Sequence, residues 1–332
     1  MTQTIMEKEA KQAPSVIEGQ IKANQAQAEK IGAKLREINP KMVMLIGRGS
    51  SDHAGVFGKY LIEIEAGVPT FAAAPSVSSV YGKQLKLDDA LVIVISQSGR
   101  SPDILAQAEM AKKAGAYCVA LVNDETSPLK DIVDEVLPLK AGAEISVAAT
   151  KSYLATLSAL LQLTAYWTEN KELVSALDTL PAALQNIIDS EPQLTSKSIE
   201  DVKNMVVLGR GLGFAVSKEM ALKLKEVSSI HAEAFSSAEF LHGPVTLVEQ
   251  GLAILNCAVN DESAQSHQEQ IDEVDSRGAD LVHLRQTDNN VHPRLAPLVV
   301  LQRFYLDVAE VAVTRGFNPD EPKGLKKVTR TL

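Results

Sequence analysis

Residues 42–49 read MVMLIGRG, and residues 205–211 read MVVLGRG. In both places a short apolar run stops at Gly-Arg-Gly, and a stretch with the periodicity of an amphipathic helix follows. A buried parallel strand that ends in a glycine turn before a helix is how a doubly wound α/β domain begins. Because this unit occurs twice, the sequence predicts two copies of one α/β domain. The copies lie too far apart for a solenoid repeat.

The composition is typical of a globular protein and excludes several classes of function. Of the 332 residues, 45% are hydrophobic and 23% are charged, and the formal net charge is -9. Nucleic-acid-binding proteins usually have the opposite charge balance, so we expect no nucleic-acid partner. Cys118 and Cys257 lie in apolar runs and read as buried thiols rather than as a disulfide or metal pair. We find no signal peptide and no membrane-spanning run, and therefore expect a cytoplasmic protein.

The predicted organisation has five parts. We expect an N-terminal helical segment at 1–40, a first α/β domain at 41–170, a helical linker at 171–200, a second α/β domain at 201–315 and a C-terminal tail at 316–332. The expected strands are 42–46, 70–73, 90–96 and 117–122 in the first domain and 205–208, 252–258 and 280–284 in the second. The expected helices are 17–38, 54–66, 102–115, 147–167, 182–188, 215–228, 263–277 and 297–315.

The strongest chemical signal is the stretch ISQSGRSPD at residues 95–103. It follows a predicted parallel strand and enters a helix, which is the edge where open α/β sheets bind ligands. Side-chain hydroxyls and an amide, from Ser96, Gln97, Ser98 and Ser101, would lie beside the unpaired N–H groups of that helix. This arrangement predicts a phosphate site that needs no lysine or arginine. An ordinary capped turn is the alternative interpretation.

A second turn, Gly47 to His53, also joins a predicted strand to a helix. Ser50 and Ser51 would either cap the helix or donate hydrogen bonds to a ligand, and this signal alone does not decide between them. A dinucleotide site requires the pattern G-x-G-x-x-G, but Asp52 stands where the third glycine would be. We therefore expect no NAD.

Titratable residues suited to proton transfer lie in the second domain. Lys223 and Glu226 are three residues apart and share a helix face, although a solvated ion pair has the same spacing. His242 precedes Gly-Pro at a forced turn, in a loop rich in titratable groups from residue 231 onward. A carboxylate and a histidine beside one sugar phosphate could transfer protons at neutral pH. A structural histidine is the alternative.

These motifs together resemble the sugar isomerase (SIS) family. Within it the chain is similar to the isomerase half of glucosamine-6-phosphate synthase and, more closely, to stand-alone glucosamine-6-phosphate deaminases. The resemblance runs from Met6 to Leu332 and rests on SQSG at 96–99, EISVA at 144–148, KLKE at 223–226, HGP at 242–244 and the tail from Asp320 to Lys327. It implies two tandem SIS domains, each a five-stranded parallel sheet flanked by helices.

The resemblance also implies roles for particular residues. Substrate binding is implied for Ser96, Gln97, Ser98 and Ser101 at the phosphate, for Ser51, and for a pocket wall at Val147 and Ala149. Alanine replaces a family serine at Ala149, so that hydroxyl contact is missing. Proton transfer between C1 and C2 is implied for Glu226, with Lys223 beside the substrate hydroxyls.

Two further roles complete the implied site. Ring opening is implied for His242, which reaches the neighbouring subunit's site in a homodimer. Lys327 of the tail is implied to contact the open-chain sugar, where it can form a Schiff base. No metal or redox cofactor is implied.

The reaction we expect is conversion of glucosamine 6-phosphate and water to fructose 6-phosphate and ammonia. The chain opens Met1-Thr2-Gln3 and soon reaches the isomerase-like part, so we expect no glutaminase domain. The alternatives are a deaminase or deglycase for galactosamine 6-phosphate or a fructosyl-amine phosphate, and an aldose–ketose isomerase for another phosphosugar. A non-catalytic sugar-phosphate-binding regulator is the alternative from a different class.

Overall fold

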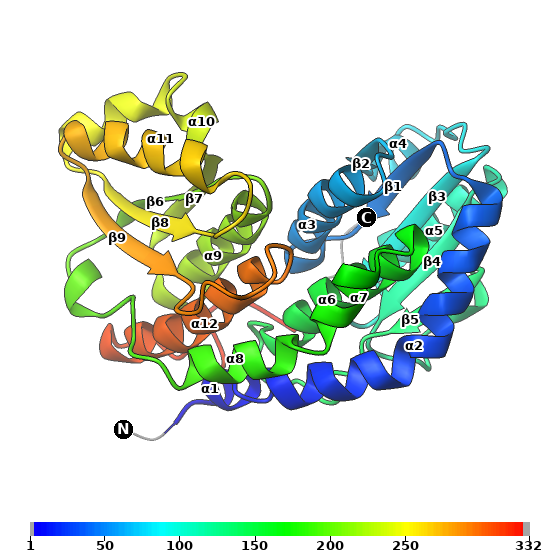
Figure 1. Cartoon of the computed structure of the whole chain (residues 1–332), viewed down its shortest axis with the longest axis horizontal. Helices are drawn as coiled ribbons and strands as arrows, with labels where there is room; N and C mark the ends of the chain where they lie inside the picture. The colour runs from blue at the N-terminus through cyan, green and yellow to red at the C-terminus, as the bar shows by residue number, and fades with distance from the viewer. Residues whose placement is uncertain (1–2, 328–332) are drawn as a thin grey trace. The chain divides into compact units, whose positions relative to one another are not determined.

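The computed structural model describes residues 3–327, which form an α/β protein with two parallel sheets (Figure 1). The first sheet has the strand order β2-β1-β3-β4-β5, and the second has the order β7-β6-β8-β9. Each sheet belongs to its own compact unit. The β1–β5 unit contains residues 15–143 and 152–178, and the β6–β9 unit contains residues 3–14, 144–151 and 179–327.

The first sheet has five strands, as expected. They are β1 (Met42–Ile46), β2 (Thr70–Ala72), β3 (Ala90–Ser96), β4 (Tyr117–Val122) and β5 (Glu135–Pro138). The accompanying helices are α2 (Ala13–Ile38), α3 (Ser50–Glu65), α4 (Ser76–Ser79), α5 (Pro102–Lys113), α6 (Lys151–Thr168), α7 (Lys171–Leu177) and the 3₁₀ helix η1 (Pro128–Asp131). All four strand pairs are parallel. Each strand is therefore joined to the next by a long crossover connection, which in this sheet contains helix.

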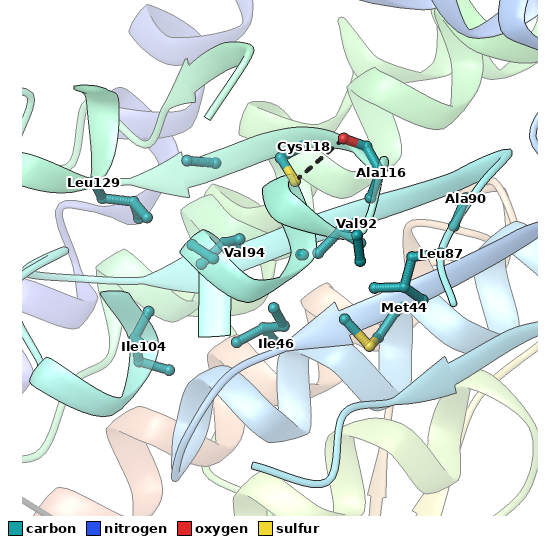
Figure 2. Packing of buried hydrophobic residues seen from close by; sticks show 14 of the residues in the cluster. Met44, Ile46, Leu87, Ala90, Val92, Val94, Ile104, Ala116, Cys118 and Leu129 are labelled. Carbon is teal, nitrogen blue, oxygen red and sulfur yellow. Dashed lines mark hydrogen bonds between the residues drawn. The ribbon is translucent and has the colours of Figure 1, made fainter. Parts of the chain in front are cut away.

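The central strands β1, β3 and β4 are buried on both faces. Figure 2 shows one face, where Met44, Val92, Val94 and Cys118 pack with Ile104 of α5. On the other face, Leu45 lies against Gly55 and Gly58 of α3, and Gly58 in turn faces Leu160 of α6. Burial on both sides explains why these strands read as continuous apolar runs rather than as alternating ones. Burial also raises the pKa of the Cys118 thiol to about 12, so this thiol is unreactive.

The second unit has the same plan with one strand fewer. Its strands are β6 (Asn204–Gly209), β7 (His231–Ser236), β8 (Ala253–Ala258) and β9 (Asp280–Arg285). Its helices are α1 (Ile5–Ala10), α8 (Leu180–Ile188), η2 (Lys197–Ile199), α9 (Leu212–Ser228), α10 (Ser237–Phe240), η3 (Pro244–Gln250), α11 (Ala264–Ser276) and α12 (Ala296–Thr314). Helix α12 is buried along almost its whole length and packs on α9 and α8.

Several expectations from the sequence need correction. Residues 204–285 form four strands, so the prediction of five is wrong for the second sheet. The stretch from residue 231 is not a loop, because 231–236 form the edge strand β7. The long helix α6 begins at Lys151 rather than at Val147. Strand β5 and helix α1 had no counterpart in our sequence prediction. Among residues 3–327, no helix is long and apolar enough to cross a membrane.

A buried polar network links α11, β8 and β9 in the second unit. The Asn256 amide N–H donates to His283 Nδ1 (3.1 Å), so Asn256 Oδ1 is left to accept from His267 Nε2 (2.7 Å). The other ring nitrogen of His267 lies 2.9 Å from Ser237 Oγ. Burial, followed by the charge of Arg210, lowers the pKa of His267 from 6.5 to about 4. The imidazole is therefore held neutral near pH 7.

Our first prediction concerns the close contact of α2 with α6. A Cβ on Gly32 would lie 2.7 Å from the backbone carbonyl atoms of Tyr166, whereas a Cβ on Gly19 of the same helix would meet nothing within 4 Å. We expect Gly32→Ala to destabilise the protein by about 1–3 kcal/mol through overpacking. Gly19→Ala, the matched control, should be neutral or stabilising by up to about 1 kcal/mol. Urea unfolding midpoints compare the two, and equal effects would contradict the close contact.

Our second prediction concerns acid stability. The folded pKa of His267 lies below its ordinary value of 6.5, so protons bind preferentially to the unfolded chain between pH 6.5 and 4. The contribution of the neutral imidazole to the free energy of unfolding is fully present above pH 6.5 and is lost as the pH falls toward 4. Over this pH interval we expect the free energy of unfolding to fall by about 3 kcal/mol more in the wild type than in His267→Gln. Urea titrations at several pH values measure the difference, and exposed His231→Gln serves as the control.

Candidate functional site

The turn that we expected to bind phosphate lies at the carboxyl end of β3 and leads directly into α5. Ser96 Oγ accepts a hydrogen bond from the Gly99 N–H (3.0 Å), and Ser98 Oγ accepts one from the Arg100 N–H (3.3 Å). The side chains of Gln97 and Ser101 are half-buried, and neither forms a hydrogen bond with any part of residues 3–327. These two polar side chains lie at or just before the N-terminus of a twelve-residue helix, where unpaired N–H groups favour an anion.

Gly99 gives this turn its shape. Its φ of +61° is a left-handed conformation that other residues rarely adopt. A Cβ at this position would lie only 2.7 Å from Ser127 Cβ and 2.9 Å from Val122 Cγ2. The turn therefore packs closely on the segment after β4, and only glycine fits there.

The neighbouring turn after β1 carries Ser51 and is tied to α5, the helix that follows the turn at residues 96–101. Arg48 Nε donates to Asp103 Oδ2 (2.8 Å), and Asp103 is buried in the first turn of α5. Ser51 lies in the first turn of α3, which starts after Gly49 at a φ of +54°. The strand order places β1 beside β3, so both turns lie at one edge of the sheet.

Both arginines of these turns already have acidic partners. Arg48 pairs with Asp103, and Arg100 donates to Asp124 (2.9 Å) and Thr126 (2.9 Å). A phosphate in this turn would therefore be held mainly by N–H groups, hydroxyls and an amide.

The corresponding turn of the second sheet, after β8, has the opposite chemistry. Ser263 donates its N–H (2.8 Å) and its hydroxyl to Asp261 Oδ1. Arg294 forms a two-pronged ion pair with Glu262 (2.7 and 2.8 Å), and this contact lowers the pKa of Glu262 to about 2. The turn after β8 carries the carboxylates of Asp261 and Glu262, whereas the turn after β3 carries serine hydroxyls. Because carboxylates repel anions, the turn after β8 is not suited to bind one.

The predicted proton-transfer residues lie on α9. Lys223 Nζ is 2.6 Å from Glu226 Oε2 and 3.1 Å from Glu219 Oε1. The side chains of Lys223 and Glu219 are 1% and 0% exposed, whereas that of Glu226 is 21% exposed. Burial disfavours the charged form of Lys223, but the two carboxylates outweigh it, and the pKa of Lys223 is raised. Glu226 is thus the open end of a buried row of alternating charges, which we call the α9 charge row (Glu219, Lys223 and Glu226).

The segment from Glu144 to Thr150, which precedes α6, is irregular and is held by contacts within the second unit. Glu9 accepts the N–H groups of Ile145 (2.5 Å) and Ser146 (3.1 Å). Burial alternates along the segment, so that Ser146, Ala148 and Thr150 point inward. Val147 and Ala149 are half-buried and share the opposite, more open side.

The C-terminal tail lies beside this segment. Lys327 Nζ donates to the Ser146 carbonyl (2.6 Å) and lies 3.5 Å from Glu144 Oε2. Asp320 accepts the N–H groups of Ile5 (2.9 Å) and Met6 (2.8 Å), and its carbonyl accepts the Val147 N–H (3.0 Å). Hydrogen bonds to α1 and to the 144–151 segment therefore hold the tail in place up to Lys327. Residues 328–332 of the tail lie outside the described residues.

His242 lies in the exposed turn between α10 and η3, and its N–H donates to the Glu239 carbonyl (3.0 Å). The candidate residues thus form two groups. Ser51, Ser96, Gln97, Ser98 and Ser101 belong to the β1–β5 unit, and Val147, Ala149, Lys223, Glu226, His242 and Lys327 belong to the β6–β9 unit. The sequence analysis missed Glu219, although its four-residue spacing from Lys223 is a detectable signal.

Comparison with known proteins identifies the family. The SIS domain model matches residues 36–166 and 198–302, one segment for each sheet. The chain therefore belongs to the SIS domain family, as the motifs predicted.

Three relatives illustrate the similarity. The chain is 31% identical, over 97% of its own length, to the glutamine–fructose-6-phosphate aminotransferase [isomerizing] of Pyrococcus horikoshii, but spans only 57% of that protein. A Silicibacter pomeroyi protein inferred to be a phosphosugar isomerase is 36% identical, with a TM-score of 0.90 over 96% of this chain and 100% of that one. The C-terminal domain of the Francisella tularensis glucosamine-fructose-6-phosphate aminotransferase is 28% identical, with a TM-score of 0.85 over 97% and 99%.

Our third prediction tests whether the turn at residues 96–101 binds phosphate. Gly99 and Gly82 both have positive φ, but a Cβ on Gly82 would meet nothing within 4 Å. We expect Gly99→Ala to weaken binding of fructose 6-phosphate at least tenfold, because relieving the clash must shift the turn. Gly82→Ala, which has the same backbone strain without the clash, should bind normally. Isothermal titration calorimetry measures the Kd of each variant for fructose 6-phosphate. Normal binding by Gly99→Ala would show that the turn does not hold the phosphate.

Proposed function

We propose that this protein acts on an amino-sugar phosphate and converts glucosamine 6-phosphate and water to fructose 6-phosphate and ammonia. One observation carries the proposal: Glu226 is the open end of the otherwise buried α9 charge row, with the Lys223 ammonium 2.6 Å away. A carboxylate held in this way is suited to moving a proton between adjacent carbons of a bound sugar.

The relatives support the substrate class. The Pyrococcus horikoshii protein is named for fructose 6-phosphate and for isomerisation. The Francisella tularensis structure, a C-terminal domain of such an aminotransferase, matches nearly the whole chain. The chain spans about half the length of the curated relatives it matches, so the nitrogen donor in their name is not carried over.

The proposed reaction needs an isomerisation, in which one proton moves to C1 and another to the C1 oxygen, followed by a hydrolysis. Glu226 removes the C2 proton of the open-chain sugar, which the neighbouring C1 carbonyl acidifies. The C1 oxygen takes a proton from the substrate's own ammonium group, and an enolamine forms. Glu226 returns the proton to C1, which leaves a C2 imine. Water adds to C2, the C–N bond breaks, and ammonia and fructose 6-phosphate are released. In this scheme Lys223 stabilises the oxygen at C1 as charge develops there.

The remaining residues receive binding and ring-opening roles. We propose that Ser96, Gln97, Ser98 and Ser101 bind the phosphate and that Ser51, Val147 and Ala149 contact the sugar. Binding energy at the phosphate would hold C1 and C2 in position for the base. His242 would open the sugar ring in a neighbouring copy of the chain, and its exposure leaves it available for this. Lys327 would contact the open chain after leaving Ser146.

A second candidate is supported by a specific observation. The Silicibacter pomeroyi relative, similar over both complete chains, is inferred to be a phosphosugar isomerase. The same carboxylate would then interconvert an aldose and a ketose phosphate without breaking a C–N bond. Release of ammonia distinguishes the two candidates.

Our fourth prediction tests the function directly. Purified protein should release ammonia and fructose 6-phosphate from glucosamine 6-phosphate in a coupled assay. Glu226→Gln should lower kcat by about 10²–10⁴, because it removes the proton-transfer group, and leave fructose 6-phosphate binding unchanged. Exposed Glu249→Gln is the matched control and should behave as wild type.

Other results of this assay would favour one of the alternative substrates or functions. Turnover of galactosamine 6-phosphate or of a fructosyl-amine phosphate instead would change the substrate. Interconversion of glucose 6-phosphate and fructose 6-phosphate without ammonia would favour the isomerase. Binding without any turnover would support the non-catalytic regulator.

A further inference from the structure

Glu9 of α1 is a buried carboxylate that the proposed mechanism does not use. It is 5% exposed, and its two oxygens accept the backbone N–H groups of Ile145 (2.5 Å) and Ser146 (3.1 Å). A buried carboxylate is costly unless it is hydrogen-bonded, and here one N–H group serves each oxygen. The carboxylate therefore fixes the orientation of the two residues that precede Val147.

Helix α1 gives this carboxylate a fixed base. Met6 and Ala10 of the helix are fully buried, and α1 packs on the buried helix α12. At the end of α1, the Ala10 carbonyl accepts a hydrogen bond from the side chain of Gln302 of α12 (3.1 Å), which is itself fully buried. Because both the helix and its support are closely packed, the Glu9 carboxylate has little freedom to move.

Ser146 connects the Glu9 contact to the C-terminal tail. Its N–H donates to Glu9. Its hydroxyl donates to the Pro319 carbonyl (3.4 Å), and its carbonyl accepts a hydrogen bond from Lys327 Nζ (2.6 Å). A shift of the Ser146 backbone would therefore move the acceptor that holds Lys327.

We infer that Glu9 is a positioning residue, which fixes the backbone at 145–146 and thereby the groups proposed to contact the sugar. Those groups are Val147, Ala149 and Lys327, so the inference rests on the sugar-binding part of the proposed function. The turn at residues 96–101, which is proposed to bind the phosphate, belongs to the other unit. Loss of the Glu9 carboxylate should therefore weaken binding of the sugar part of a ligand and leave binding of its phosphate unchanged.

The test compares a sugar phosphate with phosphate alone. We expect Glu9→Gln to raise the Kd for fructose 6-phosphate at least about tenfold, because the amide nitrogen cannot accept the second N–H. The Kd for inorganic phosphate should change less than about twofold, because its site is formed by the turn at residues 96–101. Isothermal titration calorimetry measures both. Glu7→Gln is the matched control on the same helix, where the carboxylate accepts from Gln3 and Lys11, and should leave both Kd values unchanged.

Hydrogen exchange measured by mass spectrometry gives a second readout that needs no ligand. In Glu9→Gln, exchange in a peptide spanning residues 144–150 should become at least about tenfold faster than in wild type, because its N–H groups lose a fixed acceptor. A peptide from α9 should exchange at the wild-type rate. This comparison separates a local loosening from a general loss of stability.

The outcomes separate this inference from the proposed function. If wild type releases ammonia from glucosamine 6-phosphate while Glu9→Gln binds fructose 6-phosphate normally, the inference is overturned and the function stands. If wild type releases no ammonia but Glu9→Gln loses affinity for fructose 6-phosphate alone, the proposed reaction fails and the positioning role stands. Equal weakening of both ligands would indicate general destabilisation and would overturn the inference.

A second variant covers the case in which Glu9→Gln does not fold. Glu9→Asp keeps the charge but shortens the side chain, so it should weaken fructose 6-phosphate binding in the same way but less. Wild-type affinity of Glu9→Asp for both ligands, together with wild-type exchange at 144–150, would count against us.

Discussion

The arrangement of both units depends on one constraint of parallel sheets, namely that every strand delivers its carboxyl end to the same edge. The turns after neighbouring strands therefore collect there, although they are distant in sequence. In the first unit this brings Arg48, which follows β1, within 2.8 Å of Asp103 at the start of α5. The unpaired N–H groups of the following helices face the same edge, and the chemistry of each turn decides what that edge can bind.

The two units show how one scaffold separates into two roles. After β3 the chain provides hydroxyls, an amide and a glycine, while after β8 it provides Asp261 and Glu262. In the second unit the paired charges lie on α9, where Glu219 and Lys223 are buried and Glu226 is partly exposed. The polar side chains around His267 and Asn256 are hydrogen-bonded to one another and serve the fold.

Much of the fold follows from the sequence because the central strands are buried on both faces. Strands β1, β3 and β4 have the predicted bounds, since continuous apolar runs between turns are a strong signal. The edge strands β2 and β9 were also predicted, within one residue of their bounds, whereas the edge strands β5 and β7 were missed. Strand β7 contains His231 and Glu233 with exposed side chains, so its composition resembles a loop. The start of α6 was placed too early, because the N–H groups of Val147 and Thr150 are bonded to Asp320 and Glu144 instead of to a preceding helical turn.

The candidate site was predictable where its chemistry is local and not where it depends on packing. The turn at 96–101 and the spacing of Lys223 and Glu226 are visible in the sequence. The burial of Glu219 and its contact with Tyr305 depend on how α12 packs against α9, which no local pattern encodes. The order of the tail likewise depends on contacts with residues more than 170 positions away, such as Ser146 with Pro319 and Lys327.

Asp320 joins segments that are distant in the sequence. Its carboxylate accepts the first N–H groups of α1, and its carbonyl accepts the Val147 N–H. A single residue thus links α1, the segment after α12 and residue 147. Loss of the Asp320 carboxylate would therefore remove the acceptor for the first N–H groups of α1 and, with it, a contact that anchors the segment leading to Lys327.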